Sequence, residues 1–370
     1  MKIARLTTYP LTCEIGDSLG TSQHDWKSIS ILMVRVETNE GHVGWGEGLA
    51  RRAPRAYAHL VDDLLAPLVI GADPFAVEAI WARLYRVLSG RSGGMLLEAM
   101  SAIDIALWDI MGKATGCPVH RLLGHMDRTT VDAYASSVGW NDDAIAEQQT
   151  LQMIAWGFRQ IKVKIGAPVN AAIRRARLVR EIVGDGIRLM ADANWIFDVD
   201  DALVVAKELA ELGYAFLEEP IVPEDVEGYR LLARKSPIRI AAGESEYTSM
   251  GFAKLISDRS IGLVQPDVAR SGGITETRKI ISLARAFHTA YAPHIGFSGA
   301  VCAAASLQLA ASSPNFDTYE CMTVKNPLRD SITVEPVADP TSLVDGRLLV
   351  PNQPGLGIEI DEVAVKKYLA

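Results

Sequence analysis

The sequence predicts an α/β fold in which eight strand–helix units close into a barrel, preceded by a smaller α+β domain. The main observation is the spacing of three acidic residues: Asp192, Glu218 and Glu244 each end an apolar run, at equal intervals of 26 residues. A strand, a helix and two short loops need about that many residues, because an eight-unit barrel uses ~250 residues. The strands of such a barrel end on one rim, so the three carboxylates are expected to converge.

Polar residues continue this spacing in both directions and mark the remaining strands. The first strand is expected at 131–137, and the other seven end at or near Lys164, Asp192, Glu218, Glu244, Asp267, His294 and Glu320. Apolar residues at helical spacing predict the intervening helices at 142–156, 170–184, 200–212, 225–235, 249–257, 274–287 and 299–312. Eight consecutive units favour a closed barrel over an open doubly wound sheet, and no GxGxxG motif opens the first unit.

The first 125 residues have a different pattern, which predicts a separate α+β domain. Strands are expected at 2–10, 28–38 and 42–47, with a hairpin turn at 39–41. Helices are expected at about 54–65, 74–88 and 95–114. We therefore predict a first domain at 1–125 and a barrel at 126–329. The tail, about 330–370, is expected to return to the first domain rather than to extend the barrel.

Composition limits the class of protein. A chain of 370 residues suits a barrel plus a smaller domain, and its net charge of −8 provides no basic surface for nucleic acid. The four cysteines have neither paired nor metal-type spacing, which is typical of a reducing compartment. No apolar run reaches membrane-spanning length, and the N-terminus lacks a charged-then-apolar leader. We expect a cytoplasmic homo-oligomeric enzyme with a small-molecule carboxylate substrate and no nucleic-acid or membrane partner.

The three evenly spaced carboxylates are the predicted metal ligands. They would repel one another unless a hard cation lay between them, and oxygen ligands suit Mg²⁺, with Mn²⁺ as an alternative. Any one of them alone would be interpreted as a surface residue at the start of a loop, but three at equal intervals favour a metal site. Glu219 competes with Glu218. Adjacent strand residues face opposite sides, so only one of the two can point at the metal; the even spacing selects Glu218 and leaves Glu219 a supporting or salt-bridge role.

Two further pairs predict proton-transfer groups. Lys162 and Lys164 alternate on one strand, so both face the barrel interior, where burial and mutual repulsion are expected to lower their pKa and produce a neutral amine. The alternative, a strand edge with solvated lysines, is disfavoured by the surrounding valine and isoleucine. Asp267 and His294 end consecutive strands; a carboxylate bonded to one imidazole nitrogen fixes the tautomer and leaves the other nitrogen free to carry a proton.

Seven motifs in order, KVKIG, DANW, LEEP, GES, QPDVARSGGIT, PH and YE, resemble the enolase superfamily, specifically its mandelate racemase subgroup. The segment SAIDIALWDIMGKATGCPVHRLLG also matches the end of that family's N-terminal domain, so the resemblance extends over essentially the whole chain. It implies a modified TIM (β/α) barrel with an N-terminal α+β capping domain, completed by the C-terminal tail, whose loops close over the barrel mouth. It also implies one Mg²⁺ that stabilises an enediolate.

The resemblance assigns roles to individual residues. It implies that Lys164 is the base on one face of the substrate, that Lys162 steadies the substrate carboxylate, and that His294 and Asp267 form the second acid–base unit. Glu320 would hydrogen-bond a substrate carboxylate oxygen as the protonated acid, or else form a loop-edge salt bridge. Asn194, two residues past Asp192, is a predicted substrate contact. The muconate-lactonising branch has a lysine on the sixth strand, whereas residues 267–271 contain none.

The implied function is Mg²⁺-dependent removal of the proton next to a carboxylate. Many members of the mandelate racemase subgroup use it to dehydrate a sugar acid, and we expect dehydration of an aldonic or aldaric acid to a 2-keto-3-deoxy acid. The alternatives are a racemase or epimerase of an α-hydroxy acid, a sugar-lactone cycloisomerase, and a non-catalytic ligand-binding barrel. Specificity is expected to depend on two capping loops, about 15–27 and 47–56. Their candidate substrate contacts are His24, Arg51 and Arg52, which would suit a hydroxylated acid or a diacid, although either arginine could equally be a solvated charge.

Overall fold

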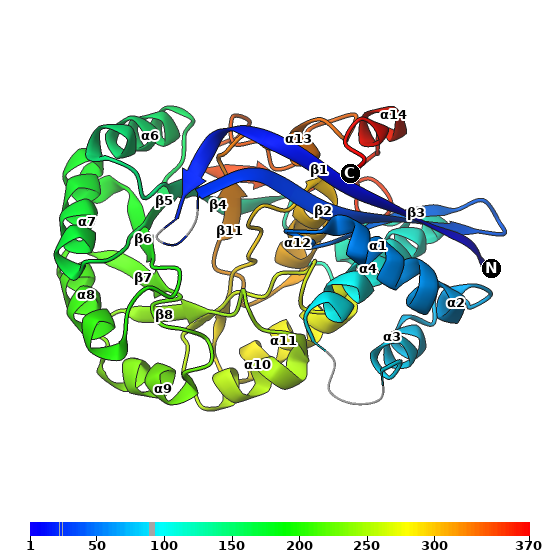
Figure 1. Ribbon diagram of the computed structural model, residues 1–370, viewed down its shortest axis with the longest axis horizontal. Helices are drawn as coiled ribbons and strands as arrows, with labels where there is room; N and C mark the ends of the chain where they lie inside the picture. Colours follow the sequence, from blue (N-terminus) through cyan, green and yellow to red (C-terminus); the bar gives the residue numbers. More distant parts are fainter. Residues whose placement is uncertain (22, 24, 89–92) are drawn as a thin grey trace.

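The computed structural model describes residues 1–21, 23, 25–88 and 93–370 (Figure 1). Its main feature is a ring of eight parallel strands, in which β4 to β10 pair in chain order and β11 pairs with β4. A parallel bridge between Tyr291 and Phe316 links β10 to the segment before β11, and this closes the ring. The strands are β4 Thr130–Val138, β5 Gln160–Lys164, β6 Arg188–Asp192, β7 Tyr214–Glu218, β8 Arg239–Ala242, β9 Leu263–Val264, β10 Ala290–Tyr291 and β11 Tyr319–Met322. The predicted barrel is confirmed.

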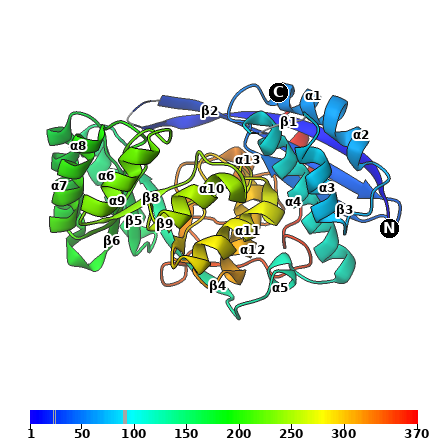
Figure 2. The ribbon, with the colours of Figure 1, turned by 90° about the horizontal axis from the view of Figure 1, so that it is seen from below.

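Helices cover the outside of this ring (Figures 1 and 2). Asp142, Asp198 and Asp225 begin three of them by accepting a backbone N–H of the first turn, which explains why these helices start there. The helices after β4 to β10 are α6 Asp143–Ala155, α7 Val169–Val183 with the short 3₁₀ helix Gly184–Gly186, α8 Val199–Glu211, α9 Val226–Lys235, α10 Thr248–Ser257, α11 Gly273–Ala286 and α12 Ala300–Ser312. Each lies within two residues of its predicted range.

The N-terminal domain is a three-stranded antiparallel sheet covered by helices. Its elements are β1 Ile3–Gly20, β2 Asp25–Thr38, β3 Val43–Gly48, α1 Pro54–Leu60, a π-helical turn Val61–Leu65, α2 Ala66–Val69, α3 Val77–Tyr85, α4 Met95–Thr115 and α5 Val119–Leu122. Alternate glycines on β3 let its backbone lie directly on α4. A Cβ on Gly44, Gly46 or Gly48 would meet a carbonyl oxygen of α4 at 2.1, 1.7 or 2.4 Å, so only glycine fits this face.

The first capping loop, predicted at about 15–27, consists mainly of strand residues. β1 continues to Gly20 and β2 begins at Asp25, with a shift in pairing register between Glu14 and Leu19. The glycine, aspartate and serine at 16–20 favour a turn locally, but the antiparallel ladder with β2 outweighs that preference. Figures 1 and 2 show this hairpin extending from the N-terminal domain toward β5 and β6, where Gln23 Nε2 donates to the Asn194 carbonyl at 2.6 Å.

The C-terminal tail contacts both domains. It contains α13 Pro327–Asp330, β12 Arg347–Leu349 and α14 Glu362–Lys366. β12 pairs antiparallel with β4, whereas Leu369 bridges to Leu11 on β1 and the Val119 N–H donates to the Gly355 carbonyl. We propose a division into a capping domain (1–125), a barrel (126–329) and a tail (about 330–370) that returns to the first domain. Within the described ranges, no helix combines the length and apolar character needed to cross a bilayer.

Candidate active site

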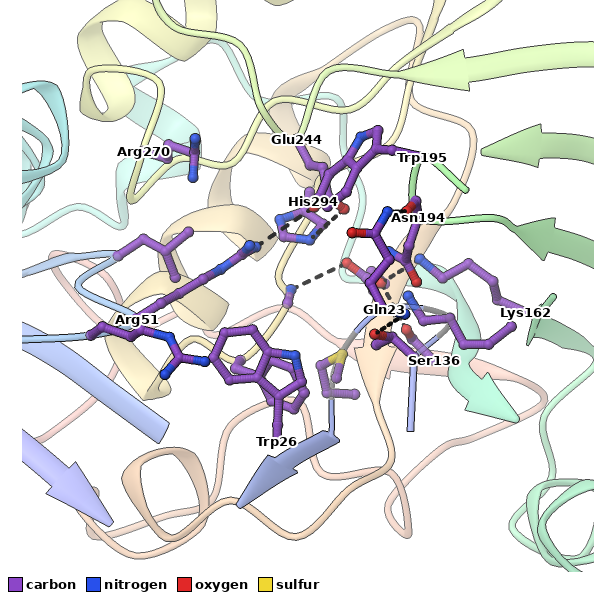
Figure 3. A pocket seen from close by; sticks show the side chains of 18 of the residues that line it. Gln23, Trp26, Arg51, Ser136, Lys162, Asn194, Trp195, Glu244, Arg270 and His294 are labelled. Atoms are coloured by element: carbon purple, nitrogen blue, oxygen red, sulfur yellow. Dashed lines mark hydrogen bonds and ion pairs between the residues drawn. The ribbon is translucent and has the colours of Figure 1, made fainter. Parts of the chain in front are cut away.

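A cavity of about 380 Å³ lies at the carboxyl ends of the barrel strands, between the barrel and the N-terminal domain (Figure 3). The N-terminal domain contributes Thr21, Gln23, Trp26, Leu49, Arg51, Arg52, Tyr57 and Glu98 to its lining. The barrel contributes Ser136, Lys162, Lys164, Asn194, Trp195, Glu244, Arg270, His294, Gly296, Phe297, Glu320 and Met322. The cavity is therefore a site that neither domain forms alone.

The three predicted metal ligands are buried at consecutive strand ends. Asp192 and Glu218 end β6 and β7, and Glu244 lies two residues past β8; their exposed fractions are 0, 1 and 6%. Each is held by a cation of the chain, since Lys164 Nζ lies 2.5 Å from Asp192, Lys162 Nζ 2.7 Å from Glu218 and His294 Nε2 3.1 Å from Glu244. Among the described residues, no three acidic, histidine or cysteine side chains lie in an arrangement ready to surround a metal ion.

The two lysines of β5 both face the barrel interior, as predicted. Lys162 is 1% exposed, and its Nζ donates to Glu218 and Glu320 at 2.7 Å each. The expected lowering of its pKa is wrong: burial opposes the charge, but the carboxylates of Glu218 and Glu320 outweigh burial and hold the pKa of Lys162 well above its usual value. Lys162 is thus a buried cation, which suits binding of a carboxylate. Lys164 lies at the strand end, beside Asp192.

His294 and Asp267 form the predicted pair. His294 Nδ1 lies 2.8 Å from Asp267 Oδ2, and the second Asp267 oxygen accepts the backbone N–H of Ala269 at 2.9 Å. Nε2 of His294 points instead to Glu244. Burial opposes the imidazolium charge, yet Glu244 and Asp267 together raise the pKa of His294 to about 10. In this arrangement His294 carries a proton on Nε2, at the edge of the cavity.

Glu320 lies in β11 and is fully hydrogen-bonded as a carboxylate. Ser136 Oγ and Lys162 Nζ each approach its Oε1 at 2.7 Å, and the backbone N–H groups of Ile295 and Gly296 donate to Oε2 at 2.7 and 3.3 Å. Although burial opposes ionisation, Lys162 and His294 hold the pKa of Glu320 below its usual value. The expectation of a protonated Glu320 is therefore wrong, because four donors leave its oxygens in the acceptor role.

The predicted substrate contacts differ in how the structure places them. Asn194 is 7% exposed, lines the cavity and has a side-chain oxygen that accepts no hydrogen bond from any described residue. Arg51 lines the cavity 3.7 Å from Glu244, and the Arg52 guanidinium lies over the Trp26 ring, 5.2 Å from its centre. His24 lies outside the described residues. The structure thus brings Asn194, Arg51 and Arg52 to the cavity.

Glu219 points away from the cavity and holds the next loop. It has a positive φ of 42° and accepts Trp195 Nε1 at 2.9 Å, the Tyr229 hydroxyl at 2.8 Å and the Gly243 N–H at 2.9 Å. Gly243 immediately precedes Glu244. Glu219 therefore has a supporting position under the Glu244 loop.

Sequence reasoning missed several residues of the cavity wall. Arg270 lies 3.3 Å from Glu98, whose second oxygen accepts the Tyr57 hydroxyl at 2.6 Å. Ser136, at the carboxyl end of β4, contacts Glu320. The strand-end argument that located the acidic residues applies equally to Ser136. No comparable signal marks Glu98, because it lies in α4, far in sequence from the barrel, and reaches the cavity only when the domains pack.

Comparison with known proteins agrees with this geometry. The family model described as "Mandelate racemase / muconate lactonizing enzyme, N-terminal domain" matches residues 12–124, and "Enolase C-terminal domain-like" matches residues 145–364. D-galactarolactone cycloisomerase from Agrobacterium fabrum is 33% identical, over 100% of this chain and 99% of the relative. D-galactonate dehydratase from Xanthomonas euvesicatoria is 34% identical, over 99% and 94%.

A solved racemase from Streptomyces coelicolor with bound magnesium is 30% identical to this chain and superimposes with a TM-score of 0.90 over 100% of both chains. Both domains of the chain thus match one group of enzymes. The chain belongs to the mandelate racemase/muconate lactonizing enzyme family of the enolase superfamily.

Proposed function

We propose that this protein is a Mg²⁺-dependent acid-sugar dehydratase, a carbon–oxygen lyase that converts an aldonic or aldaric acid to a 2-keto-3-deoxy acid. One observation carries the proposal: Lys164 at the end of β5 and His294 in the loop after β10 reach the same cavity, beside three buried carboxylates. Two opposed proton-transfer groups are what dehydration needs, because one proton leaves the α-carbon and another joins the departing β-hydroxyl.

Asp192, Glu218 and Glu244 are the proposed metal ligands. Their chemistry fits a hard cation, since all donors are carboxylate oxygens buried at consecutive strand ends. Their present partners are the cations Lys164, Lys162 and His294, so the negative charge of the site already requires neutralisation. When bound, Mg²⁺ would act as a Lewis acid that spreads the charge developing on the substrate carboxylate. The same oxygen ligands suit Mn²⁺.

The side chains of the chain supply the proton transfers. Lys164 Nζ, in its neutral amine form, takes the α-proton, while Lys162 holds the substrate carboxylate by charge. His294, oriented by Asp267 at Nδ1, donates the Nε2 proton to the β-hydroxyl, so the C–O bond breaks and water leaves. The enol that remains rearranges to the keto acid. Asn194 lines the cavity, and its buried side-chain oxygen has no donor among the described residues, so a substrate hydroxyl would satisfy it.

An isomerase is the second candidate function. A relative that is 33% identical over its full length is named a cycloisomerase, and the named dehydratases are as similar. The same pair of groups could remove a proton from one face and return it to the other, or open a sugar lactone. A non-catalytic ligand-binding barrel is disfavoured, because binding alone does not need two opposed proton-transfer groups.

The candidate specificity residues come from both domains that line the cavity. We propose Arg51, Arg52 and Asn194 as substrate contacts, together with His24 on the sequence argument alone. Arg51 lines the cavity with a side chain that is 25% exposed, so a distal carboxylate or hydroxyl could bind its guanidinium. The wall also contains Glu98 and Arg270, and such a mixed-charge surface suits a polyhydroxylated chain.

A panel of aldonic acids, aldaric acids and their lactones, incubated with Mg²⁺ in D₂O and followed by proton NMR, tests the proposal. Formation of a 2-keto-3-deoxy acid supports dehydration. Exchange of the α-proton without a new product indicates racemisation or epimerisation, and a ring-opened lactone product indicates cycloisomerisation. Absence of all three across the panel would contradict the proposal.

We also propose a cytoplasmic homo-oligomer. All four cysteines are free thiols and three of them are buried, which is compatible with a reducing compartment. Large apolar side chains remain exposed on the single chain, for example Met250 at 58% and Leu349 at 67%. Light scattering on the purified protein would give the assembly mass.

A further inference from the structure

Glu47 is a fully buried carboxylate that the proposed chemistry does not use. It lies on β3 of the N-terminal domain with an exposed fraction of 0%, yet both oxygens bind the barrel. Oε1 accepts the Gly299 N–H at 2.6 Å and Oε2 accepts the Cys302 N–H at 3.0 Å. These amides belong to the start of α12, where helix N–H groups have no partner within the helix. Glu47 therefore caps a barrel helix from the other domain.

The approach of Glu47 to α12 is close. Gly299, the N-cap residue, has no side chain with which to cap its own helix. A Cβ at this position would lie 3.0 Å from Glu47 Oε2 and 2.8 Å from both Ile31 Cδ1 and the Leu328 carbonyl oxygen. The glycine thus leaves room for a carboxylate supplied by β3. The partial positive charge at a helix N-terminus also favours a carboxylate there.

The segment that Glu47 holds connects directly to the proton-transfer groups. Cys302, in the first turn of α12, places its thiol 3.8 Å from Asp267 Oδ1, whereas His294 binds the other oxygen of Asp267. The loop that joins His294 to α12 also contains the Ile295 and Gly296 amides that donate to Glu320. A shift in the start of α12 would therefore move the partners of both the His294 pair and Glu320.

We infer that Glu47 is a positioning residue for the His294–Asp267 pair, through which docking of the N-terminal domain sets the geometry of the acid–base site. This inference rests on the proposed function. It predicts that loss of Glu47 impairs the step served by His294 more than substrate binding or the step served by Lys164. A displacement of about 1 Å in such a group costs about 10²-fold in rate.

Asp104 provides a matched control. It is also a buried carboxylate of the N-terminal domain, 3% exposed on α4, and its Oδ2 accepts the Thr275 N–H at 2.9 Å in the first turn of α11, which likewise begins after a glycine. Among the hydrogen bonds of the described residues, none joins Asp104 to Asp267 or His294. Glu47→Ala and Asp104→Ala each remove one helix cap between the domains, but only the first lies beside the acid–base pair.

The first experiment needs no substrate. Hydrogen exchange followed by mass spectrometry compares the intact wild-type protein with Glu47→Ala, Glu47→Gln and Asp104→Ala. We expect faster exchange in the peptide containing Gly299–Cys302 for Glu47→Ala, an intermediate rate for Glu47→Gln, which keeps one acceptor oxygen, and the wild-type rate for Asp104→Ala. Unchanged exchange in this peptide for Glu47→Ala would overturn the inference, whatever the substrate.

The second experiment uses the substrate found in the acid-sugar panel. We expect Glu47→Ala to lower kcat by about 10²-fold with KM nearly unchanged, while α-proton exchange that depends on Lys164 continues. Glu47→Gln should recover some of the lost kcat. Asp104→Ala should retain kcat even where it lowers Tm as much. If both alanine variants lose kcat equally, in proportion to Tm, Glu47 has only a structural role and the inference is wrong. If no acid in the panel is converted, the proposed function is contradicted, but the result of the hydrogen-exchange experiment still holds.

Discussion

The acid–base cavity is a set of buried charges that neutralise one another. Lys162 lies between Glu218 and Glu320, and His294 lies between Asp267 and Glu244. Burial of any one of these groups without its partner would cost several kcal/mol, so the residues act as a unit. A substrate carboxylate that enters the cavity adds negative charge, and the arginines at the rim are the groups placed to balance more of it.

Arg51→Ala tests whether the distal end of the substrate is charged. If the substrate is a diacid, KM for the diacid should rise far more than KM for the corresponding monoacid, since a charge-assisted contact contributes ~1.5–3 kcal/mol. Steady-state kinetics on a matched aldaric–aldonic pair gives the comparison, with Arg52→Ala as the companion variant. Equal changes for both acids would favour a neutral distal end.

The placement of a single residue was predictable from the sequence where its position in a strand alone determines which way its side chain points. Strand ends placed Asp192, Glu218 and Glu244 on one rim, because period and spacing are properties of the sequence. The protonation states of Lys162 and Glu320 were not predictable. They depend on which partners lie within hydrogen-bond distance, and Lys162 meets Glu320 only because β11 folds back beside β4.

At the scale of elements, close backbone contact holds the N-terminal domain together, and carboxylates that cap barrel helices dock this domain on the barrel. The glycines of β3 bring its backbone onto α4, and Glu47 and Asp104 accept N–H groups of α12 and α11. These contacts have no local sequence signal, which is why helix ranges were predicted well while the packing was not. Both strands of the β1–β2 hairpin were predicted, but the extension of β1 to Gly20 was missed for the same reason, since strand length depends on pairing between strands.

Gly46→Ala should destabilise the protein strongly. The new Cβ would lie 1.7 Å from the Ala102 carbonyl oxygen, so β3 and α4 would have to separate. We expect the free energy of unfolding to fall by about 1–3 kcal/mol. Gly186→Ala is the control, because a Cβ there meets nothing within 4 Å. Thermal unfolding measures both. A Tm for Gly46→Ala equal to that of the control would contradict the described contact.

Asp104 should make stability depend on pH. Burial raises the pKa of Asp104 from 3.8 to about 7, so the folded state binds this proton more tightly than the unfolded state. The contribution of Asp104 to the free energy of unfolding is most favourable below about pH 4. It falls by at most ~1.4 kcal/mol per pH unit as the pH rises to about 7, and it is constant above that pH. The Tm of the wild type relative to Asp104→Asn should therefore fall between pH 5 and pH 7. A difference independent of pH would contradict this account.

At the scale of the whole molecule, the groups proposed for catalysis come from the barrel, whereas the proposed substrate contacts come from both domains. The barrel supplies the carboxylates and the proton-transfer side chains at its rim, and the N-terminal domain covers them with Trp26, Arg51 and Glu98. Family membership and barrel topology followed from motifs spread along the chain. Substrate identity did not, because the covering wall is assembled from segments that meet only in the folded molecule.

Metal dependence should be a property of the three-carboxylate cluster. Treatment with EDTA should abolish turnover, and Mg²⁺ should restore it. Asp192→Asn and Glu244→Gln should weaken Mg²⁺ binding in titration calorimetry as well as activity, because each removes a charged oxygen ligand. Full turnover in EDTA, or unchanged Mg²⁺ affinity in both variants, would rule these residues out as ligands.

The central claim is that Lys164 and His294 act on opposite faces of one substrate. Proton NMR in D₂O on Lys164→Ala and His294→Asn, with the substrate found in the panel, tests it most directly. Both variants should lose dehydration, by about 10²–10⁴-fold or more, while one of them still exchanges the α-proton with solvent. The configuration of the acid that still exchanges identifies the face each residue serves. Turnover at the wild-type rate in both variants would contradict the two-base account.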